Sequence, residues 1–190
     1  DSIFALLQRP LAKVQDSVQL VYAGPLDAFL IKIKLSLLGG VVLAFPFILA
    51  FIAAFVAPGL THRERRSVRV ALVAGLVLFC IGLTFGYVLL PFGLPFLLSF
   101  GRSSIQNLWP LQVYISFCFR LLLGFGLVFE LPVVLGMLVR LRIVRTETLA
   151  KGRPYAVIAA LVLAAVLTPP DPFSQAMLAV PIMVLYEISI

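Results

Sequence analysis

Charged residues are scarce in this chain, and their scarcity excludes a soluble fold. Only 12% of the 190 residues are Asp, Glu, Lys or Arg, while 62% are hydrophobic and the mean hydropathy is +1.13. Soluble domains average about 25% charged residues. The composition therefore predicts an integral membrane protein, with room for about five or six spanning helices and no soluble domain of any size.

Histidine and cysteine are also nearly absent, which narrows the possible chemistry. His62 is the one histidine, so neither an HExxH-type metal site nor a serine with a histidine base in the same span can form. Cys80 and Cys118 lie in apolar runs, and we expect small buried hydrophobic residues there, not a disulfide or a metal pair. We expect no enzyme, no cofactor and no metal.

The few charges that are present are distributed unevenly. Basic residues outnumber acidic ones by 15 to 8, but the segment 91–110 has only Arg102 and the segment 168–172 has no basic residue. Cytoplasmic loops of membrane proteins are rich in Lys and Arg. This rule places two basic loops and the C-terminus in the cytoplasm, and residues 1–27 outside. The basic residues of these loops are Arg63, Arg65, Arg66, Arg69, Arg140, Arg142, Arg145, Lys151 and Arg153.

Apolar runs between these loops predict a polytopic all-α membrane protein. Five spans are expected at about 28–57, 70–90, 111–139, 155–167 and 173–188, with cytoplasmic loops at 58–69 and 140–154 and an outer cap at 1–27. At ~1.5 Å per residue the uncharged runs of the last two, 155–167 and 173–186, each cover roughly 20 Å of a ~30 Å hydrocarbon core, so they form a short hairpin. Because the chain starts outside with Asp1 and has no signal peptide, we expect a missing upstream span and six in total.

Prolines and glycines predict where these helices bend, end or touch. Pro46 and Pro132 should kink their spans, and Pro10 should break a short amphipathic helix in the cap. The second span should end before Pro91 and Pro95. Gly82 and Gly86 have the spacing of a helix-contact motif.

One carboxylate lies deep in a predicted span. Glu130 is ten residues from Arg140, so about 15 Å below the cytoplasmic edge. An ionisable residue there costs about 2.5–3.5 kcal/mol to insert and is a functional candidate by default. The alternative is a protonated glutamic acid that is hydrogen-bonded to a neighbouring helix.

Polar residues also gather at the tip of the short hairpin. Thr168, Asp171 and Gln175 should end roughly 10 Å short of the outer surface, where they need water or protein partners. Alternatively, the bilayer thins around the hairpin and Asp171 caps the last helix.

Four motifs occur in an order that resembles a known family. They are PGLTHRERR at 58–66, FELP at 129–132, RPY at 153–155 and LTPPDPFSQ at 167–175. Over the whole chain the sequence is similar to TatC, the multi-span subunit of the twin-arginine protein translocase of the bacterial inner membrane. The resemblance implies six spans, a concave shape and a cytoplasmic N-terminus. It also implies an oligomeric receptor that binds twin-arginine signal peptides, hands folded cargo to single-span TatA/TatB-type subunits and uses the proton-motive force.

The resemblance also assigns residues. It implies that Glu64 contacts the two arginines of the signal peptide, beside Arg65 and Arg66, which anchor the loop and keep the carboxylate ionised. Without it, Glu64 would be interpreted as part of an ordinary loop ion pair. The family pattern of a basic residue followed by His-Glu-Arg-Arg is shifted here, so no role is assigned to His62.

The other family positions fall on residues already considered. The intramembrane glutamate corresponds to Glu130, the hairpin tip to Thr168, Asp171 and Gln175, and the proline of the periplasmic cap to Pro10. We expect Thr168 and Gln175 to contact the single-span partner subunits. The alternative is that both residues form hydrogen bonds with the hairpin's own backbone.

Two other functions remain open from the residues alone. A proton-coupled small-solute transporter would use Glu130 and Asp171 as a proton relay, and a membrane insertase would use a polar cavity. Neither function requires Glu64. The net charge of +7 is explained by the two basic loops, so we expect no nucleic-acid partner.

Overall fold

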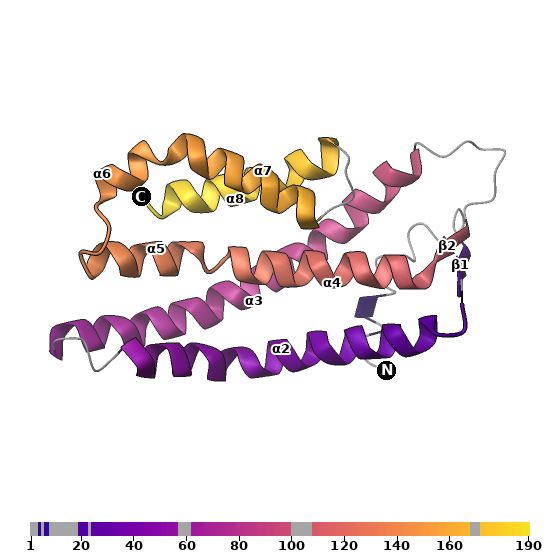
Figure 1. The fold of residues 1–190 in the computed structure, drawn as a ribbon, viewed down its shortest axis with the longest axis horizontal. Coiled ribbons are helices and arrows are strands. Elements are labelled where there is room, and N and C mark those ends of the chain that lie inside the picture. The colour runs from indigo at the N-terminus through magenta and orange to yellow at the C-terminus, as the bar shows by residue number, and fades with distance from the viewer. Residues whose placement is uncertain are drawn as a thin grey trace.

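The fold is a bundle of helices of unequal length (Figure 1). The computed structural model describes residues 4, 6–7, 19–22, 24–56, 62–99, 108–167 and 172–190. The long helices are α2 (Asp27–Val56), α3 (His62–Ser99) and α4 (Leu111–Val128), with α4 followed after a two-residue turn by α5 (Leu131–Arg140). The remaining elements are α6 (Thr146–Lys151), α7 (Arg153–Leu167), α8 (Pro172–Ile188), β1 (Gln19–Val21) and β2 (Leu108–Pro110).

Among the described residues, three segments are long and apolar enough to cross a membrane. They are Asp27–Phe55, Ser67–Pro91 and Leu111–Arg140, and the apolar segments Arg153–Leu167 and Leu178–Ile188 are shorter. The predicted helical architecture, with long apolar helices followed by a pair of shorter ones, is therefore confirmed. The number of spans in the bilayer stays a prediction.

Helix α3 is longer at both ends than the sequence analysis predicted. It begins at His62, so residues 62–69 of the predicted loop are helical, and it continues through Pro91 and Pro95 to Ser99. Arg and Glu favour helix at the start. At the other end, neighbouring helices and local adjustments can satisfy the backbone groups that a proline frees in a membrane helix. The prediction that these prolines end the helix was wrong.

The structural prolines lie in different helical settings. Pro46 lies inside α2, which continues as one element. Pro132 lies in the first turn of α5, where its missing N–H costs no hydrogen bond, and the helix break precedes it at Phe129 and Glu130. The bends expected at these two prolines stay predictions, and Pro10 lies outside the described residues.

The core forms where α3 crosses α4. Gly82 lies so close to α4 that an added Cβ would be 2.6 Å from the Phe125 carbonyl oxygen, and Gly86 contacts the side chain of the same Phe125. Gly126 of α4 approaches the Phe79 ring of α3 in the same way. The glycine spacing thus marks a close helix crossing, which is what small residues permit in membrane proteins.

The cysteines have different environments. Cys118 is fully buried on α4, as expected for a small hydrophobic residue, whereas Cys80 is exposed on α3. Both are free thiols. The expectation of burial was wrong for Cys80, because the face of α3 that carries it has no packed neighbour among the described helices.

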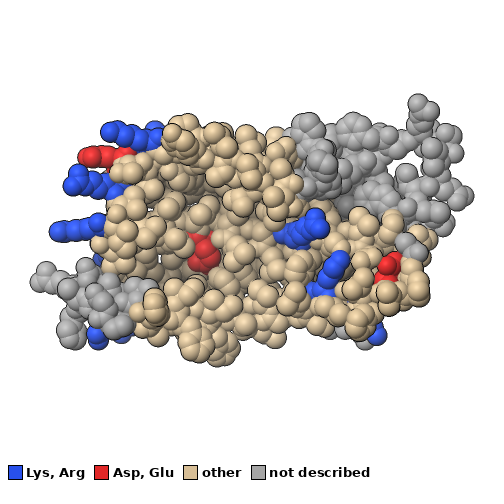
Figure 2. Space-filling model, in the orientation of Figure 1, with Lys and Arg blue, Asp and Glu red and all other residues tan. Residues whose placement is uncertain are grey.

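The two ends of the bundle differ in charge and in structure. Figure 2 shows blue side chains gathered at the end where α6 lies. We call this the basic end; its described residues include Arg140, Arg142, Arg145 and Lys151, all exposed. At the opposite end β1 pairs in parallel with β2, and the Tyr114 hydroxyl donates a hydrogen bond to the Leu7 carbonyl oxygen at 2.6 Å. The N-terminal segment is therefore attached to the end far from the basic residues.

Candidate functional site

Glu64 lies in the first turn of α3, at the basic end of the bundle. A carboxylate in the first turn is favoured by the partial positive charge of a helix N-terminus. Arg65, its neighbour, is exposed. The side chains of Glu64 and Arg66 lie outside the described residues.

Two other acidic residues are described at the basic end. Glu147 is exposed in the first turn of α6. Glu187, near the end of α8, forms an ion pair with Arg153 at 2.9 Å. This pair is half exposed, so it contributes little to stability, but it occupies the Glu187 carboxylate. Sequence analysis missed Glu187, although a glutamate at the end of the last apolar run could have indicated a partner for Arg153.

Glu130 is a buried carboxyl group in the turn between α4 and α5. Its side chain is only 8% exposed, and Oε1 has no hydrogen-bond partner among the described residues. The carboxyl group fits because Gly75 of α3 has no side chain: a Cβ there would lie 2.8 Å from Oε2. A buried polar atom without a partner costs roughly 1–3 kcal/mol, so this oxygen is a place where water or a ligand group would bind favourably.

Glu130 lines a partly open cavity of about 300 Å³ between α2, α3 and α5, which we call the inner groove. Leu49, Ala53, Ala71 and Leu138 lie in its walls, and it extends to Ile143 in the turn after α5. All described lining residues except Glu130 are apolar. The sequence predicted an intramembrane carboxylate at this position, and its role as a functional group stays a prediction; the structure places Glu130 in the lining of the inner groove.

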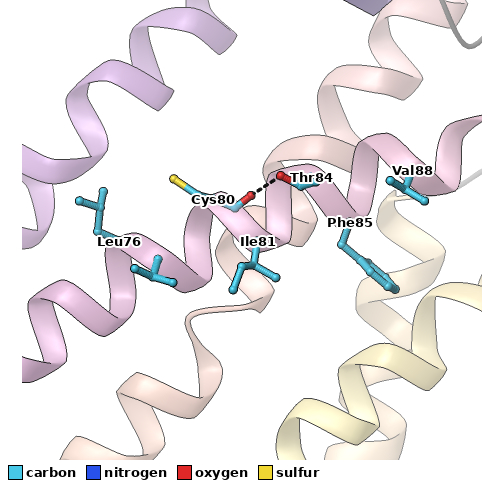
Figure 3. Close-up of a pocket in the computed structure, with 7 residues that line it drawn as sticks. Leu76, Cys80, Ile81, Thr84, Phe85 and Val88 are labelled. Carbon is cyan, nitrogen blue, oxygen red and sulfur yellow. Dashed lines mark hydrogen bonds between the residues drawn. The ribbon is translucent and has the colours of Figure 1, made fainter.

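A second, larger hollow of about 610 Å³ lies along one helix face (Figure 3). Its lining residues, among them Leu76, Ile81 and Val88, all belong to α3. Among the described lining residues the one hydroxyl group, on Thr84, donates a hydrogen bond to the Cys80 carbonyl oxygen of the same helix at 2.8 Å. The described lining residues offer a ligand only the free thiol of Cys80 besides apolar surface, so we assign this hollow no chemistry.

The hairpin of α7 and α8 contains the third group of predicted residues. Small buried residues, Ala160 and Ala164 on α7 and Ala179 on α8, let the two helices approach closely. The Gln175 amide nitrogen donates a hydrogen bond to the Leu161 carbonyl oxygen at 3.0 Å, so this side chain bonds back to the hairpin backbone. Thr168 and Asp171 lie outside the described residues.

The predicted loop 140–154 is attached to the hairpin of α7 and α8 by a hydrogen bond as well as by the Arg153–Glu187 ion pair. The Tyr186 hydroxyl donates a hydrogen bond to the Leu149 carbonyl oxygen of α6 at 2.8 Å, and lies 3.1 Å from where a Gly152 Cβ would stand. Thus the end of α8 holds both α6 and the start of α7.

One polar contact in the span region was missed by sequence analysis. The Lys34 ammonium group of α2 donates to the Ser116 hydroxyl of α4 at 2.5 Å, and that hydroxyl donates to the Gln112 carbonyl oxygen at 2.5 Å. A lysine two turns inside an apolar run is the signal that could have revealed it, since charged residues in membrane helices usually have partners.

Comparisons with known proteins agree with this architecture. The family profile described as TatC, Sec-independent protein translocase protein, matches residues 1–181. Proteins named Sec-independent protein translocase protein TatC include one of Desulforapulum autotrophicum, 40% identical over 192 residues, with the alignment covering 100% of this chain and 71% of that protein. The protein of the same name from Escherichia coli strain K12 is 36% identical over 192 residues, covering 100% of this chain and 74% of that protein.

A solved structure gives the same result for the fold. The crystal structure titled Twin Arginine Translocase Receptor-TatC in DDM superposes with a TM-score of 0.90 at 34% identity, and the match covers 99% of this chain and 84% of that chain. The described apolar helices fit a multi-pass membrane protein. The chain therefore belongs to the TatC family, whose members are transport proteins that act as components of the Sec-independent protein translocase.

Proposed function

We propose that this protein is the signal-peptide receptor and core subunit of the twin-arginine translocase in a bacterial inner membrane. In this function it binds twin-arginine signal peptides, assembles with single-span TatA/TatB-type subunits and exports folded proteins with the proton-motive force. The observation that carries the proposal is the position of Glu64 in the first turn of α3, at the basic end, in a chain that belongs to the TatC family.

The chemistry of arginine recognition favours this position. A guanidinium group binds a carboxylate through two parallel hydrogen bonds, which an ammonium group cannot do. The Glu64 carboxylate belongs to a residue at the positive end of a helix, and arginines are its neighbours in the sequence. Both features favour the ionised form of a carboxyl group. Of the described acidic residues at this end, Glu187 is paired with Arg153, which leaves Glu147 as the natural comparison.

Replacing Glu64 by Gln should therefore abolish binding of a signal peptide with an arginine pair and leave the helical fold intact. The measurement is photo-crosslinking of a synthetic signal peptide to the purified protein in detergent. A peptide with two lysines in place of the arginines should crosslink poorly to the unchanged protein. Its crosslinking yield should be as low as the yield of the arginine peptide with the Glu64→Gln variant.

The matched control is Glu147→Gln, which removes one exposed carboxylate from the same end of the molecule. It should reduce crosslinking less than twofold, because a rim charge contributes little when it is exposed. Undiminished binding by Glu64→Gln, or an equal loss in Glu147→Gln, would contradict the assignment to Glu64.

The hairpin is proposed as the partner-subunit contact. Helices of 15 and 17 residues cover about 22–26 Å, so α7 and α8 leave one side of the protein shorter than a ~30 Å core. Gln175 uses its amide nitrogen within the hairpin, but its side-chain carbonyl oxygen has no partner among the described residues. A partner helix with a hydrogen-bond donor at this depth would satisfy that oxygen, by about 0.6–2 kcal/mol.

A further inference from the structure

The inner groove ends at arginines that have no partner among the described residues. Arg69, Arg140 and Arg142 are exposed, and none of them forms a hydrogen bond or an ion pair with a described residue. Each stands next to a lining residue of the groove: Val68, Leu141 or Ile143. Three exposed arginines are thus direct sequence neighbours of residues that line the inner groove, at its basic end.

The length of the groove corresponds to one leaflet of a bilayer. Its deep end is at Glu130, about ten residues from Arg140, which is ~15 Å along a helix. Half of a ~30 Å hydrocarbon core has the same depth. The groove therefore extends from the headgroup level at the basic end to the middle of the membrane.

The volume of the groove favours a thin occupant. A helix 10–12 Å across would need roughly 1,200 Å³ for the same 15 Å of length. The partly open cavity has about 300 Å³, a volume that favours an extended hydrocarbon chain over a peptide helix lying wholly inside it.

We propose that the inner groove binds an anionic phospholipid of the cytoplasmic leaflet. One acyl chain lies in the groove, and the phosphate is held by Arg69, Arg140 and Arg142. The chain ends at Glu130, whose carboxyl group closes the deep end of the groove and is left to water. This site is separate from Glu64 and does not depend on the function proposed for it.

The backbone of Arg142 gives this assignment independent support. Its φ of 58° lies in the left-handed region, where a non-glycine residue costs roughly 1–3 kcal/mol and which is enriched at ligand-binding sites. The arginine closes the end of α5, a position where glycine is usual. A guanidinium group that binds a phosphate accounts for an arginine in a place that suits glycine better.

The site can be tested by lipid titration of the purified protein in detergent, followed by native mass spectrometry. The two lipids are phosphatidylglycerol and phosphatidylcholine with the same acyl chains. Phosphatidylglycerol should bind at least tenfold more tightly. The double variant Arg140→Gln/Arg142→Gln should lose about 25-fold in affinity, at about fivefold per arginine. The control Arg145→Gln/Lys151→Gln removes the same charge from the basic end, away from the groove mouth, and should lose less than threefold.

A third variant tests the acyl chain. Ala71→Phe fills the wall of the groove and should weaken both lipids, with the melting temperature checked to show that the variant is folded. A phosphatidylglycerol with a photoreactive acyl chain should label residues between Val68 and Leu72 or between Val133 and Leu138. Excess inorganic phosphate should not displace the lipid, because it lacks the chain.

Several results would overturn the proposal. Equal affinity for the two lipids, or an equal loss in both charge variants, would mean that the arginines act only as a general surface charge. Unchanged lipid binding by a folded Ala71→Phe would place the chain elsewhere. Displacement of the lipid by the isolated hydrophobic segment of a signal peptide, with crosslinks from that segment to Leu72 and Leu138, would assign the groove to the peptide.

Discussion

At the scale of single residues, Arg142 is the clearest case of a side chain in an unfavourable conformation. The turn after α5 has two backbone hydrogen bonds that close a helix end, from Arg142 N to Val139 O and from Ile143 N to Leu138 O. This arrangement requires a left-handed residue at position 142, and glycine adopts that conformation without a steric cost.

Arg142→Gly should therefore raise the stability of the lipid-free protein by about 1 kcal/mol. Thermal unfolding in detergent, followed by circular dichroism, measures the change. Arg145→Gly is the control: Arg145 has φ −91° and ψ 145°, an ordinary extended conformation, so glycine there should give no gain. A loss of stability in Arg142→Gly would show that the guanidinium group makes a contact worth more than the backbone strain.

Glu130 is a second residue whose environment leads to a testable prediction. We expect its side of the inner groove to be reached by water, since a carboxyl oxygen without a partner is otherwise costly to bury. In a chain without Cys80 and Cys118, cysteine at position 130 should react with a small water-soluble thiol reagent faster than cysteine at Phe125, which is fully buried in the core. Equal protection at both positions would show that the groove is dry.

At the scale of elements, the crossing of α3 and α4 depends on glycine. Gly82→Ala should destabilise the protein by about 1–3 kcal/mol, because the new Cβ would be 2.6 Å from a backbone oxygen that cannot move away as a flexible side chain could. Gly40→Ala and Gly136→Ala are matched controls in α2 and α5, since no atom lies within 4 Å of their Cβ positions. If all three variants have the same melting temperature as the unchanged protein, the crossing of α3 and α4 must be looser than the structure indicates.

The hairpin is the other element with a distinct prediction. Cysteines along 157–167 and 176–186, paired with cysteines in a single-span subunit, should form disulfides with helical periodicity. Exposed positions such as Ile158 and Val162 should crosslink, and buried Ala160 and Ala164 should not. Crosslinks confined to the exposed face of α3 around Val77 and Cys80 would place the partner there and leave Gln175 with its internal hydrogen bond only.

Hydropathy and charge were sufficient to predict the apolar helices but not their ends, and they did not predict α6, which lies in the expected loop 140–154. The apolar runs predicted the helical segments because membrane burial of a span depends on composition over some 20 residues. The ends of α3 were missed because they depend on how neighbouring helices satisfy a proline-containing backbone, which no local pattern records. Gly82 and Gly86 could be recognised by spacing, whereas Lys34 and Ser116 pair only because α2 and α4 lie side by side.

The candidate site was predictable to a smaller degree. Glu130 stood out as a charge in an apolar run, and the structure places it in a groove. The groove itself could not be predicted, since it is formed by three helices and by the absence of a side chain at Gly75. Glu64 gained its role only from the family resemblance, because an acid among arginines is common in any loop.

At the scale of the whole molecule, the attachment of the N-terminal segment sets an order of events during synthesis. The Tyr114 hydroxyl binds the Leu7 carbonyl oxygen across 107 residues of chain, and β1 must pair with a strand that follows α3. At 5–20 residues per second, the ribosome needs on the order of 5 to 20 s to make the second partner after the first. For that time the N-terminal segment has left the ribosome without its binding site, so it is accessible to proteases and chaperones until α4 arrives.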